Sequence, residues 1–494
     1  MTYSLLTEAW IPLVGVDGSR TEASLKEALL EPHRWRGIDG VNPVETLSLY
    51  RLLLAIAHRA VGPSLDVRTP LVESWPHAKL DGYLNQWANH FDLLHPETPF
   101  LQVQALSQAQ LTPSPWTRLA LDRASGAGRM IWDHSVDDRP VPQPIAAVAR
   151  LLIAHLQFTP CGLVKALRTS AVRAPACSLL LMMPLGETLQ ETLALNLYPQ
   201  KKADYVNDLP AWERPPLTIK ELQKPQNVVI DGPAHRYTFL SRAVLVLAED
   251  NLVSKILYAE GLTIGEDSTP VADPMAATVI GKKGSMPLLL NEQKAFWRDY
   301  PALSGSKEST AAAVVNHGIR VREEQEDERR LDLLAGGLLC NRAKILFWRL
   351  EQRRFSPMVL RQQNLIAASD RALDLAEDTG RELNKSVYLL CAEWLQRGSE
   401  KDSDPKDVRE LQQSIQASAI FWGGLESPFW TFIQQLGEND DYLSALSDWR
   451  EHLRQAVKNT WNHARCALGF DSRALAAAGS LDYRRRKMLA LLKD

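Results

Sequence analysis

The sequence lacks an excess of positive charge. Its 494 residues carry 56 Lys and Arg against 59 Asp and Glu, which gives a formal net charge of −3. Proteins that bind nucleic acid on their own usually carry a basic surplus, because the release of counterions from phosphates supplies affinity. Any contact of this chain with DNA must therefore use local basic patches or the help of an assembly. The length allows two or three domains with cores of their own.

Cysteine is scarce and scattered. Zinc ribbons and disulfide-rich domains need clustered or paired cysteines, and the five cysteines of this chain include no C-x-x-C pair. They are Cys161, Cys177, Cys340, Cys391 and Cys466. We therefore predict no bound metal and no disulfide framework. Scattered cysteines are typical of a reducing compartment, which predicts a cytoplasmic protein.

Long hydrophobic runs are also missing. The apolar stretch at 179–185 is far shorter than the roughly 20 residues that a helix needs to cross a bilayer. The N-terminal segment has no basic region and carries Glu8 within its short apolar stretch, unlike a secretory signal. We predict no membrane partner.

Motifs of the common enzyme classes do not occur. Residues 281–285 are too short for a phosphate-binding loop, and the sequence has neither a G-x-S-x-G elbow nor an H-E-x-x-H pair. The acidic run at 323–328 is typical of a solvated helix face, and Asp133-His134 is an isolated pair. We therefore predict a protein that is not an enzyme and needs no cofactor. An unrecognised hydrolase stays open as an alternative, because carboxylates that converge from separate elements leave no sequence pattern.

The character of the sequence changes near residue 360. Before it, short β-like runs such as 227–230 and 243–247 alternate with helical stretches at 45–60 and 144–156. Most of the 29 prolines lie before residue 302, which indicates many turns. Residues 1–360 are thus predicted to form a large domain of mixed α and β structure.

Residues 361–494 show helical periodicity instead. Leu383, Val387, Leu390 and Trp394 form one apolar stripe. Asp404-Pro405 is a typical N-cap followed by proline in the first turn. Further stripes follow at 446–456 and 475–492. Amphipathic helices joined by short loops predict an antiparallel bundle.

Seven segments, in order along the chain, resemble the CasA family of CRISPR-associated proteins. They are Leu6–Pro12, His90–Val103, Leu185–Leu197, Asp208–Glu213, Asp273–Met275, Phe296–Asp299 and Cys340–Ile345. The order and spacing of these segments, followed by a helical bundle, carry the resemblance. It implies an α+β fold, with a large N-terminal domain followed by a C-terminal four-helix bundle.

The resemblance also implies a function. The chain would be the non-enzymatic large subunit of a type I-E CRISPR Cascade complex, in which RNA–DNA pairing supplies the sequence specificity. Such a subunit recognises the protospacer-adjacent motif in double-stranded DNA, promotes strand opening and R-loop formation, and recruits a helicase–nuclease. The implied partners are the CRISPR guide RNA, the target DNA, other Cascade subunits and the helicase–nuclease.

The family's strand-separating wedge aligns with Asn341-Arg342-Ala343 and the adjoining Lys344. Arg342 stands where the family commonly has glutamine, and an arginine can both stack on a base and reach a phosphate. The following stretch is basic and includes Arg349 and Arg353. A solvated basic face of a helix is the alternative interpretation of that stretch.

Three further segments correspond to family sites. Lys282-Lys283 matches a basic pair near the DNA, although loop lysines often serve only solubility. The loop Ile131-Trp132-Asp133-His134 matches a contact with the guide RNA handle and a neighbouring subunit, the alternative being a Trp132 packed on its own domain. Pro160-Cys161-Gly162 matches a glycine-rich loop near the motif, but one glycine remains, which predicts altered motif recognition. The cysteines that hold zinc in some members are absent here.

A protein–protein scaffold without direct DNA contact remains the second interpretation. In that case the basic stretch would pack on acidic partners. Salt-dependent DNA binding by the isolated chain distinguishes the two.

Overall fold

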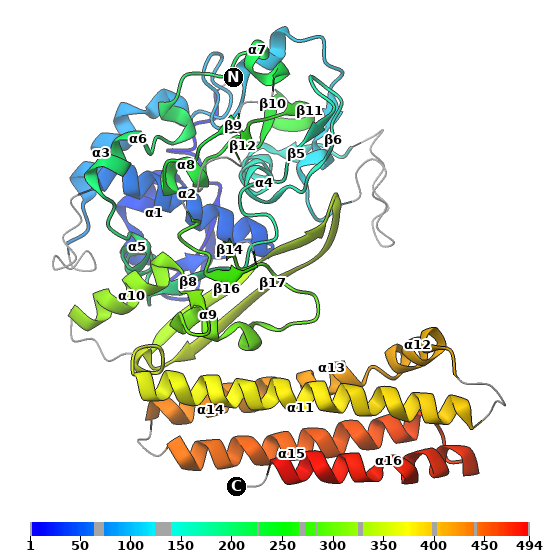
Figure 1. The fold of residues 1–494 in the computed structure, drawn as a ribbon. Coiled ribbons are helices and arrows are strands. Elements are labelled where there is room, and N and C mark those ends of the chain that lie inside the picture. The colour runs from blue at the N-terminus through cyan, green and yellow to red at the C-terminus, as the bar shows by residue number, and fades with distance from the viewer. Residues whose placement is uncertain are drawn as a thin grey trace. The chain divides into compact units, whose positions relative to one another are not determined.

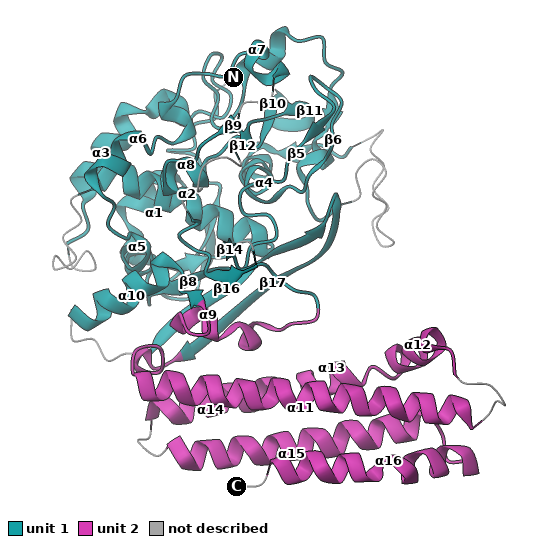
Figure 2. Cartoon of the chain, in the orientation of Figure 1, with its two compact units in different colours: residues 1–292, 309–354 teal, residues 293–308, 355–494 magenta. Residues whose placement is uncertain are grey.

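The computed structural model describes residues 2–63, 74–123, 140–224, 227–265, 272–282, 284–324, 330–397, 403–438 and 442–492. The chain forms two compact units, coloured separately in Figure 2. The first comprises 1–292 and 309–354, and the second comprises 293–308 and 355–494. The units are therefore not two continuous stretches, because 293–308 joins the C-terminal part.

Helix α2 (Pro43–Val61) forms the centre of the first unit (Figure 1). Its N-cap is Asn42, whose side chain accepts a hydrogen bond of 3.0 Å from the Glu45 N–H, and Pro43 occupies the first turn. Buried residues occur around the whole circumference of this helix, as expected for a helix in a protein core. It packs against α4 (Ile145–Phe158) and α8 (Pro233–Tyr237).

The remaining helices of this unit are short, and α3 and α5 among them pack on α2. They are α1 (Leu25–Leu30), α3 (His77–Gln86), α5 (Leu189–Asn196), α6 (Lys202–Asn207), α7 (Ile219–Gln223) and α10 (Ala313–Glu324).

The strands of the first unit form several small sheets. Among the described residues, three sheets have a path of three strands: β2–β1–β3 (Arg20–Ala23, Ile11–Gly15, Trp35–Ile38), β14–β13–β15 (Gly284–Pro287, Thr278–Gly281, Ser309–Thr310) and β17–β16–β8 (Lys344–Phe355, Leu331–Asn341, Leu181–Leu185). A fourth sheet has the order β10–β11–β4 (Arg242–Glu249, Leu252–Glu260, Ser114–Pro115), and β5 (Gln143–Pro144) also pairs with β11. Two strand pairs complete the unit: β12–β9 (Thr263–Ile264, Asn227–Val228) and β6–β7 (Gly162–Leu163, Ser170–Ala171).

The longest strands are β16 and β17, which form an extended antiparallel ribbon (Figure 1). Its inner strand β16 pairs with β8, with Asp332 opposite Leu185 and Gly336 opposite Leu181. At Gly337, with φ of 156°, an added Cβ would lie 2.4 Å from the Leu179 carbonyl oxygen. Glycine therefore permits β16 to lie directly against the segment that leads into β8.

The second unit is helical. Its helices are α9 (Pro301–Ser304), α11 (Gln363–Gln396), α12 (Pro405–Ile415), α13 (Ala417–Gly423), α14 (Glu426–Glu438), α15 (Tyr442–Ala467) and α16 (Ser472–Leu491). Helix α11 packs against α12, α13, α15 and α16, and α15 packs against α13, α14 and α16. The consecutive helices α12 to α14 thus take the place of one long helix in a four-helix bundle, beside α11, α15 and α16 (Figure 1).

Aromatic residues join 293–308 to this bundle. The Trp297 ring is fully buried, with its centroid 5.0 Å from that of Phe429 and 6.3 Å from that of Trp449. Arg298 donates hydrogen bonds of 2.9 and 3.0 Å to both carboxylate oxygens of Glu377 on α11. These contacts make the segment part of the core of the second unit. The predicted α+β class with a C-terminal helical region is confirmed.

Candidate nucleic-acid interface

The predicted wedge residues form the tip of the β16–β17 hairpin. Arg342 and Ala343 make the turn, and every residue from Asn341 to Lys344 is exposed. Arg342 has a φ of 54°, in the left-handed region. Within the described residues neither Arg342 nor Lys344 forms an ion pair, so both positive charges face solvent. The structure thereby places a basic side chain at the outermost point of a long, paired ribbon.

The basic stretch after the tip is a strand, so the alternative interpretation as a helix is wrong. Arg349, Glu351 and Arg353 stand at a spacing of two on β17 and therefore share one face. Glu351 lies 3.6 Å from Arg349 and 3.0 Å from Arg353. One carboxylate thus partly balances the two arginines predicted to contact DNA.

The predicted motif-proximal loop lies beside this tip. A Cβ added to Gly162 would lie 3.9 Å from the Ala343 Cβ, so the loop and the hairpin tip are neighbours. The buried Arg242 guanidinium holds both ends of the loop, because it donates hydrogen bonds of 2.6 Å to the Pro160 carbonyl and 2.8 Å to the Val172 carbonyl.

A second buried charge fixes the middle of the same loop. The Glu260 carboxylate, fully buried, accepts hydrogen bonds of 3.3 Å from the Ala166 N–H and 2.9 Å from the Leu167 N–H. Arg168 donates to the Gly261 carbonyl oxygen at 2.5 Å. We call residues 160–173 the clamped loop. Its backbone is held by charged groups while several of its side chains point to solvent.

The predicted lysine pair lies at the tip of the β13–β14 hairpin. Lys282 is exposed and forms no ion pair within the described residues, whereas Lys283 lies outside them. The base of this hairpin contacts the segment before β8, because the Leu290 N–H donates to the Ser178 carbonyl at 2.9 Å. The Ser178 N–H in turn donates to the Leu338 carbonyl of β16 at 2.8 Å. Both hairpins are therefore attached to the same short segment.

Three segments contain no acidic residue: 160–173 and 340–344, which lie side by side, and 278–287, whose hairpin attaches to the same segment as the wedge hairpin. Their cationic residues are Lys165, Arg168, Arg173, Lys282, Lys283, Arg342 and Lys344. Lys165 and Arg173 are exposed and were missed by the sequence analysis, which considered only 160–162 of the clamped loop. The absence of acidic residues from each segment was a signal in the sequence that could have found them. The loop Ile131–His134 lies outside the described residues.

The comparisons with known proteins agree with one another. The family model of the CRISPR-associated protein Cse1 matches residues 4–460. The CRISPR-associated protein CasA/Cse1 of Thermus thermophilus is 32% identical, and the match covers 96% of this chain and 95% of that protein. The chain belongs to the Cse1 family. The resemblance inferred from the sequence is confirmed.

Solved structures related to this Cse1 chain have the same fold. The crystal structure of Thermus thermophilus CasA superposes with a TM-score of 0.86 at 30% identity, over 99% of this chain and 100% of that one. A chain from a CRISPR RNA-guided surveillance complex superposes with a TM-score of 0.79 at 21% identity, over 99% of each chain.

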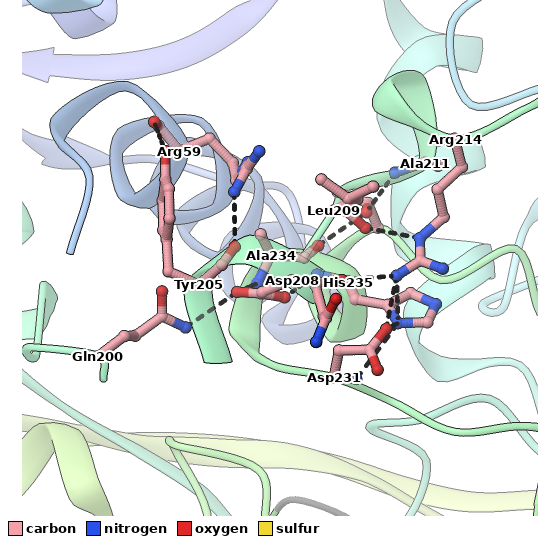
Figure 3. A network of polar contacts seen from close by, with 12 residues as sticks. Arg59, Gln200, Tyr205, Asp208, Leu209, Ala211, Arg214, Asp231, Ala234 and His235 are labelled. Atoms are coloured by element: carbon pink, nitrogen blue, oxygen red, sulfur yellow. Dashed lines mark hydrogen bonds and ion pairs between the residues drawn. The ribbon is translucent and has the colours of Figure 1, made fainter. Parts of the chain in front are cut away.

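Two of the segments that carry the resemblance to the Cse1 family have structural roles. Asp208 is buried and accepts hydrogen bonds of 3.0 and 2.8 Å from the N–H groups of Ala234 and His235 at the start of α8 (Figure 3). Gln200 donates a third of 2.9 Å. Burial raises the pKa of Asp208, although these hydrogen bonds oppose the shift. Asp208 therefore anchors a helix.

Asp273 anchors the chain ahead of the β13–β14 hairpin. It forms a fully buried, bidentate ion pair with Arg51 of α2, with N–O distances of 3.1 and 2.9 Å. Burial raises the pKa of Asp273, but the guanidinium groups of Arg51 and Arg236 lower it, and the net shift is downward. The core of α2 thus holds the segment from which Lys282 projects.

The described residues contain no group of three or more His, Cys, Asp or Glu side chains placed to hold a metal ion. Asp231 and His235 lie in contact (Figure 3), with 3.2 Å between the carboxylate and the ring nitrogen, but Arg214 also donates to the Asp231 carboxylate at 2.8 Å and balances its charge. Burial, aided by Arg214, lowers the pKa of His235 to about 4. No helix among the described residues is long and apolar enough to cross a membrane.

Proposed function

We propose that this chain is the large subunit of a type I-E CRISPR RNA-guided surveillance complex (Cascade). In this proposal it recognises the protospacer-adjacent motif in double-stranded DNA, promotes strand opening and R-loop formation, and recruits a helicase–nuclease. Membership of the Cse1 family supports the assembly, as does the fold shared with a chain of a surveillance complex. The observation that carries the DNA contact is that the hairpin tip and the adjacent clamped loop carry only positive charges, as does the lysine hairpin attached to the same segment.

Each segment has a distinct task in this proposal. The hairpin tip inserts beside the motif, and unstacking the base pairs there costs a few kcal/mol, offset by new protein–DNA contacts. Lys282 and Lys283 contact phosphates or the minor groove, which positions the duplex but carries little sequence information. The clamped loop lies next to the tip and contacts the motif, with the lysine at 165 and the arginine at 173 adding phosphate contacts.

The remaining parts of the proposal concern partners. Ile131–His134 contact the guide RNA handle and a neighbouring Cascade subunit, with Trp132 as the anchor. The protein acts in the cytoplasm, is not an enzyme and needs no cofactor.

Replacing Trp132 with Ala is expected to weaken assembly more than folding, measured by co-purification of the complex and by the melting temperature. A variant that assembles normally but melts earlier would place Trp132 in a core.

The test of the wedge uses Arg342→Ala in the assembled complex. If Arg342 separates strands, the variant opens linear targets more slowly. The deficit shrinks on negatively supercoiled DNA, where supercoiling supplies opening energy, and on targets with a melted bubble beside the motif. The measurement is the rate of R-loop formation on the three substrates.

A matched control is Lys344→Ala, two residues away on the same hairpin. If that residue only contacts a phosphate, its loss weakens binding about equally on all three substrates and makes the salt dependence shallower by about one unit. Equal deficits for Arg342→Ala on the three substrates would reduce Arg342 to a phosphate contact. No deficit for either variant, or for the loop lysines, would favour the scaffold interpretation.

A further inference from the structure

Two cysteines far apart in the sequence meet at the base of the wedge hairpin. The Cys177 and Cys340 Sγ atoms are 2.7 Å apart. Cys340 is the residue directly before the tip residue Asn341, and Cys177 lies on the segment to which both hairpins attach. Both are free thiols. A disulfide needs an S–S distance of about 2.05 Å, so a small approach of the two side chains suffices.

The surroundings make the two thiols chemically different. Contact with Cys177 lowers the pKa of the Cys340 thiol, with the Ser178 hydroxyl and Arg173 acting in the same direction. The Ser178 Oγ lies 3.3 Å from the Cys340 Sγ. The same contact, together with burial, raises the pKa of the Cys177 thiol. Cys340 is also the more exposed of the two, and since the thiolate is the nucleophile, Cys340 is the attacking sulfur and Cys177 the resolving one.

The two thiols also differ in their exposure to solvent, and this difference again makes Cys340 the first to react. Cys177 is 1% exposed, whereas Cys340 is partly exposed. An external oxidant therefore reaches Cys340 first. Low pKa, exposure and a nearby second thiol are the features of cysteines that oxidise reversibly.

We propose that Cys177 and Cys340 are a reversible oxidation site, at which a small disulfide such as oxidised glutathione converts the two thiols into a disulfide bond. The Cys340 thiolate attacks one sulfur of oxidised glutathione, forms a mixed disulfide and releases one glutathione thiolate. The Cys177 thiol then loses its proton to solvent and attacks the Cys340 sulfur, which releases the second glutathione. Two protein thiols are oxidised and one glutathione disulfide is reduced to two glutathione molecules.

The new bond ties β16 to the segment before β8 directly beside the turn. It closes a loop between residues 177 and 340, and such a cross-link restricts the unfolded chain. The oxidation site stands independently of the proposed DNA binding, because its chemistry involves this chain and glutathione alone. In a reducing compartment such disulfides are transient.

The experiment treats the full chain with oxidised glutathione under native conditions. The protein is expected to lose two of its five free thiols, to become lighter by two hydrogen atoms and to yield a Cys177–Cys340 peptide without reduction. Reduced dithiothreitol is expected to restore both thiols. Cys466→Ser, at an exposed cysteine of the second unit, is the matched control and is expected to leave the cross-link unchanged.

The single variants separate the two roles. Cys177→Ser is expected to hold glutathione on Cys340 as a stable adduct, because the resolving thiol is missing. Cys340→Ser is expected to leave Cys177 reduced, because burial keeps it from the oxidant. A wild-type chain that keeps the glutathione adduct on Cys340, cross-links Cys161 instead, or retains five thiols would overturn the proposal. These wild-type readouts hold even if a serine variant folds poorly.

Discussion

The backbone of Arg342 adopts a left-handed conformation, which residues other than glycine and asparagine seldom adopt. Its φ of 54° costs roughly 1 kcal/mol or more for a residue with a Cβ. Such a cost at the exposed end of a hairpin is consistent with a side chain kept for its function rather than for the turn.

Two substitutions at this position separate side chain from backbone. Both Arg342→Ala and Arg342→Gly remove the guanidinium, but only glycine relieves the left-handed strain. We expect Arg342→Gly to have a free energy of unfolding higher than that of Arg342→Ala by about 0.5–1 kcal/mol, measured by urea denaturation. Under the proposed function, both variants open linear DNA equally slowly. An alanine variant as stable as the glycine variant would show that the turn carries no strain.

The buried pair Arg51–Asp273 predicts a large loss of stability. Asp273→Asn leaves a buried guanidinium without its counter-charge, which costs about 3–5 kcal/mol. The control is the pair Arg20–Asp39, whose side chains are 76% and 35% exposed, and Asp39→Asn is expected to cost less than about 1 kcal/mol. Denaturant unfolding at neutral pH measures both. A small effect of Asp273→Asn would mean that water or another side chain compensates Arg51.

The same pair predicts a pH dependence. Because the pKa of Asp273 is lowered on folding, its carboxylate stabilises the fold above the ordinary value of 3.8. That contribution is lost as the pH falls through the lower value of the folded state. The stability difference between the natural chain and Asp273→Asn is therefore expected to be constant from neutral pH to about 4 and to shrink below it. A difference that shrinks already between about pH 7 and 5 would contradict the lowered pKa.

Among the elements, the clamped loop depends on a buried carboxylate. Replacing Glu260 with glutamine keeps the shape of the side chain but removes the negative charge that holds two backbone N–H groups. Hydrogen bonds to charged groups contribute about 1.5–3 kcal/mol each. We expect Glu260→Gln to speed hydrogen exchange at the Ala166 and Leu167 amides by at least about tenfold. Glu249→Gln, at the exposed end of β10, is the control, and equal exchange in both variants would contradict the clamp.

Helices were predictable where the pattern was local. The stripes of the second unit indicated the bundle, and Asp404-Pro405 marked a true start, since the Asp404 side chain accepts from the Lys406 N–H at 2.8 Å. Strand β17 was harder. The spacing of two between Arg349, Glu351 and Arg353 was available, but the run of basic residues suggested a helix face.

The site could be predicted only in part. The hairpin tip and the lysine pair came from the resemblance, and in the structure the tip lies beside 160–162. No local pattern could pair Cys177 with Cys340, because β16 and the segment before β8 meet only in the fold. The charges that hold the clamped loop, on Arg242 and Glu260, come from strands far away along the chain. Their contacts with the loop could not be predicted from the sequence either.

At the scale of the molecule, charge limits binding. With a net charge of −3 and acidic residues interspersed among most of its basic ones, we expect the isolated chain to be a monomer with weak, salt-sensitive DNA affinity. The slope of log K against log salt should be no steeper than about −5, measured by fluorescence anisotropy. The double variant Lys165→Ala and Arg173→Ala should make it shallower by about one to two units, whereas Lys220→Ala on α7 should not. Tight binding in about 0.5 M salt would contradict this expectation.

The path of the chain between the two units has a consequence for synthesis. Trp297 is made long before Phe429 and Trp449, the rings that bury it. At about 5–20 residues per second, the segment 293–308 waits roughly 7–30 s for its partners while the first unit folds around β16 and β17. During that interval a large aromatic surface is open to water. The second unit therefore completes its core only after α14 and α15 have been synthesised, and a fragment that begins at 355 would be made without Trp297, which that core buries.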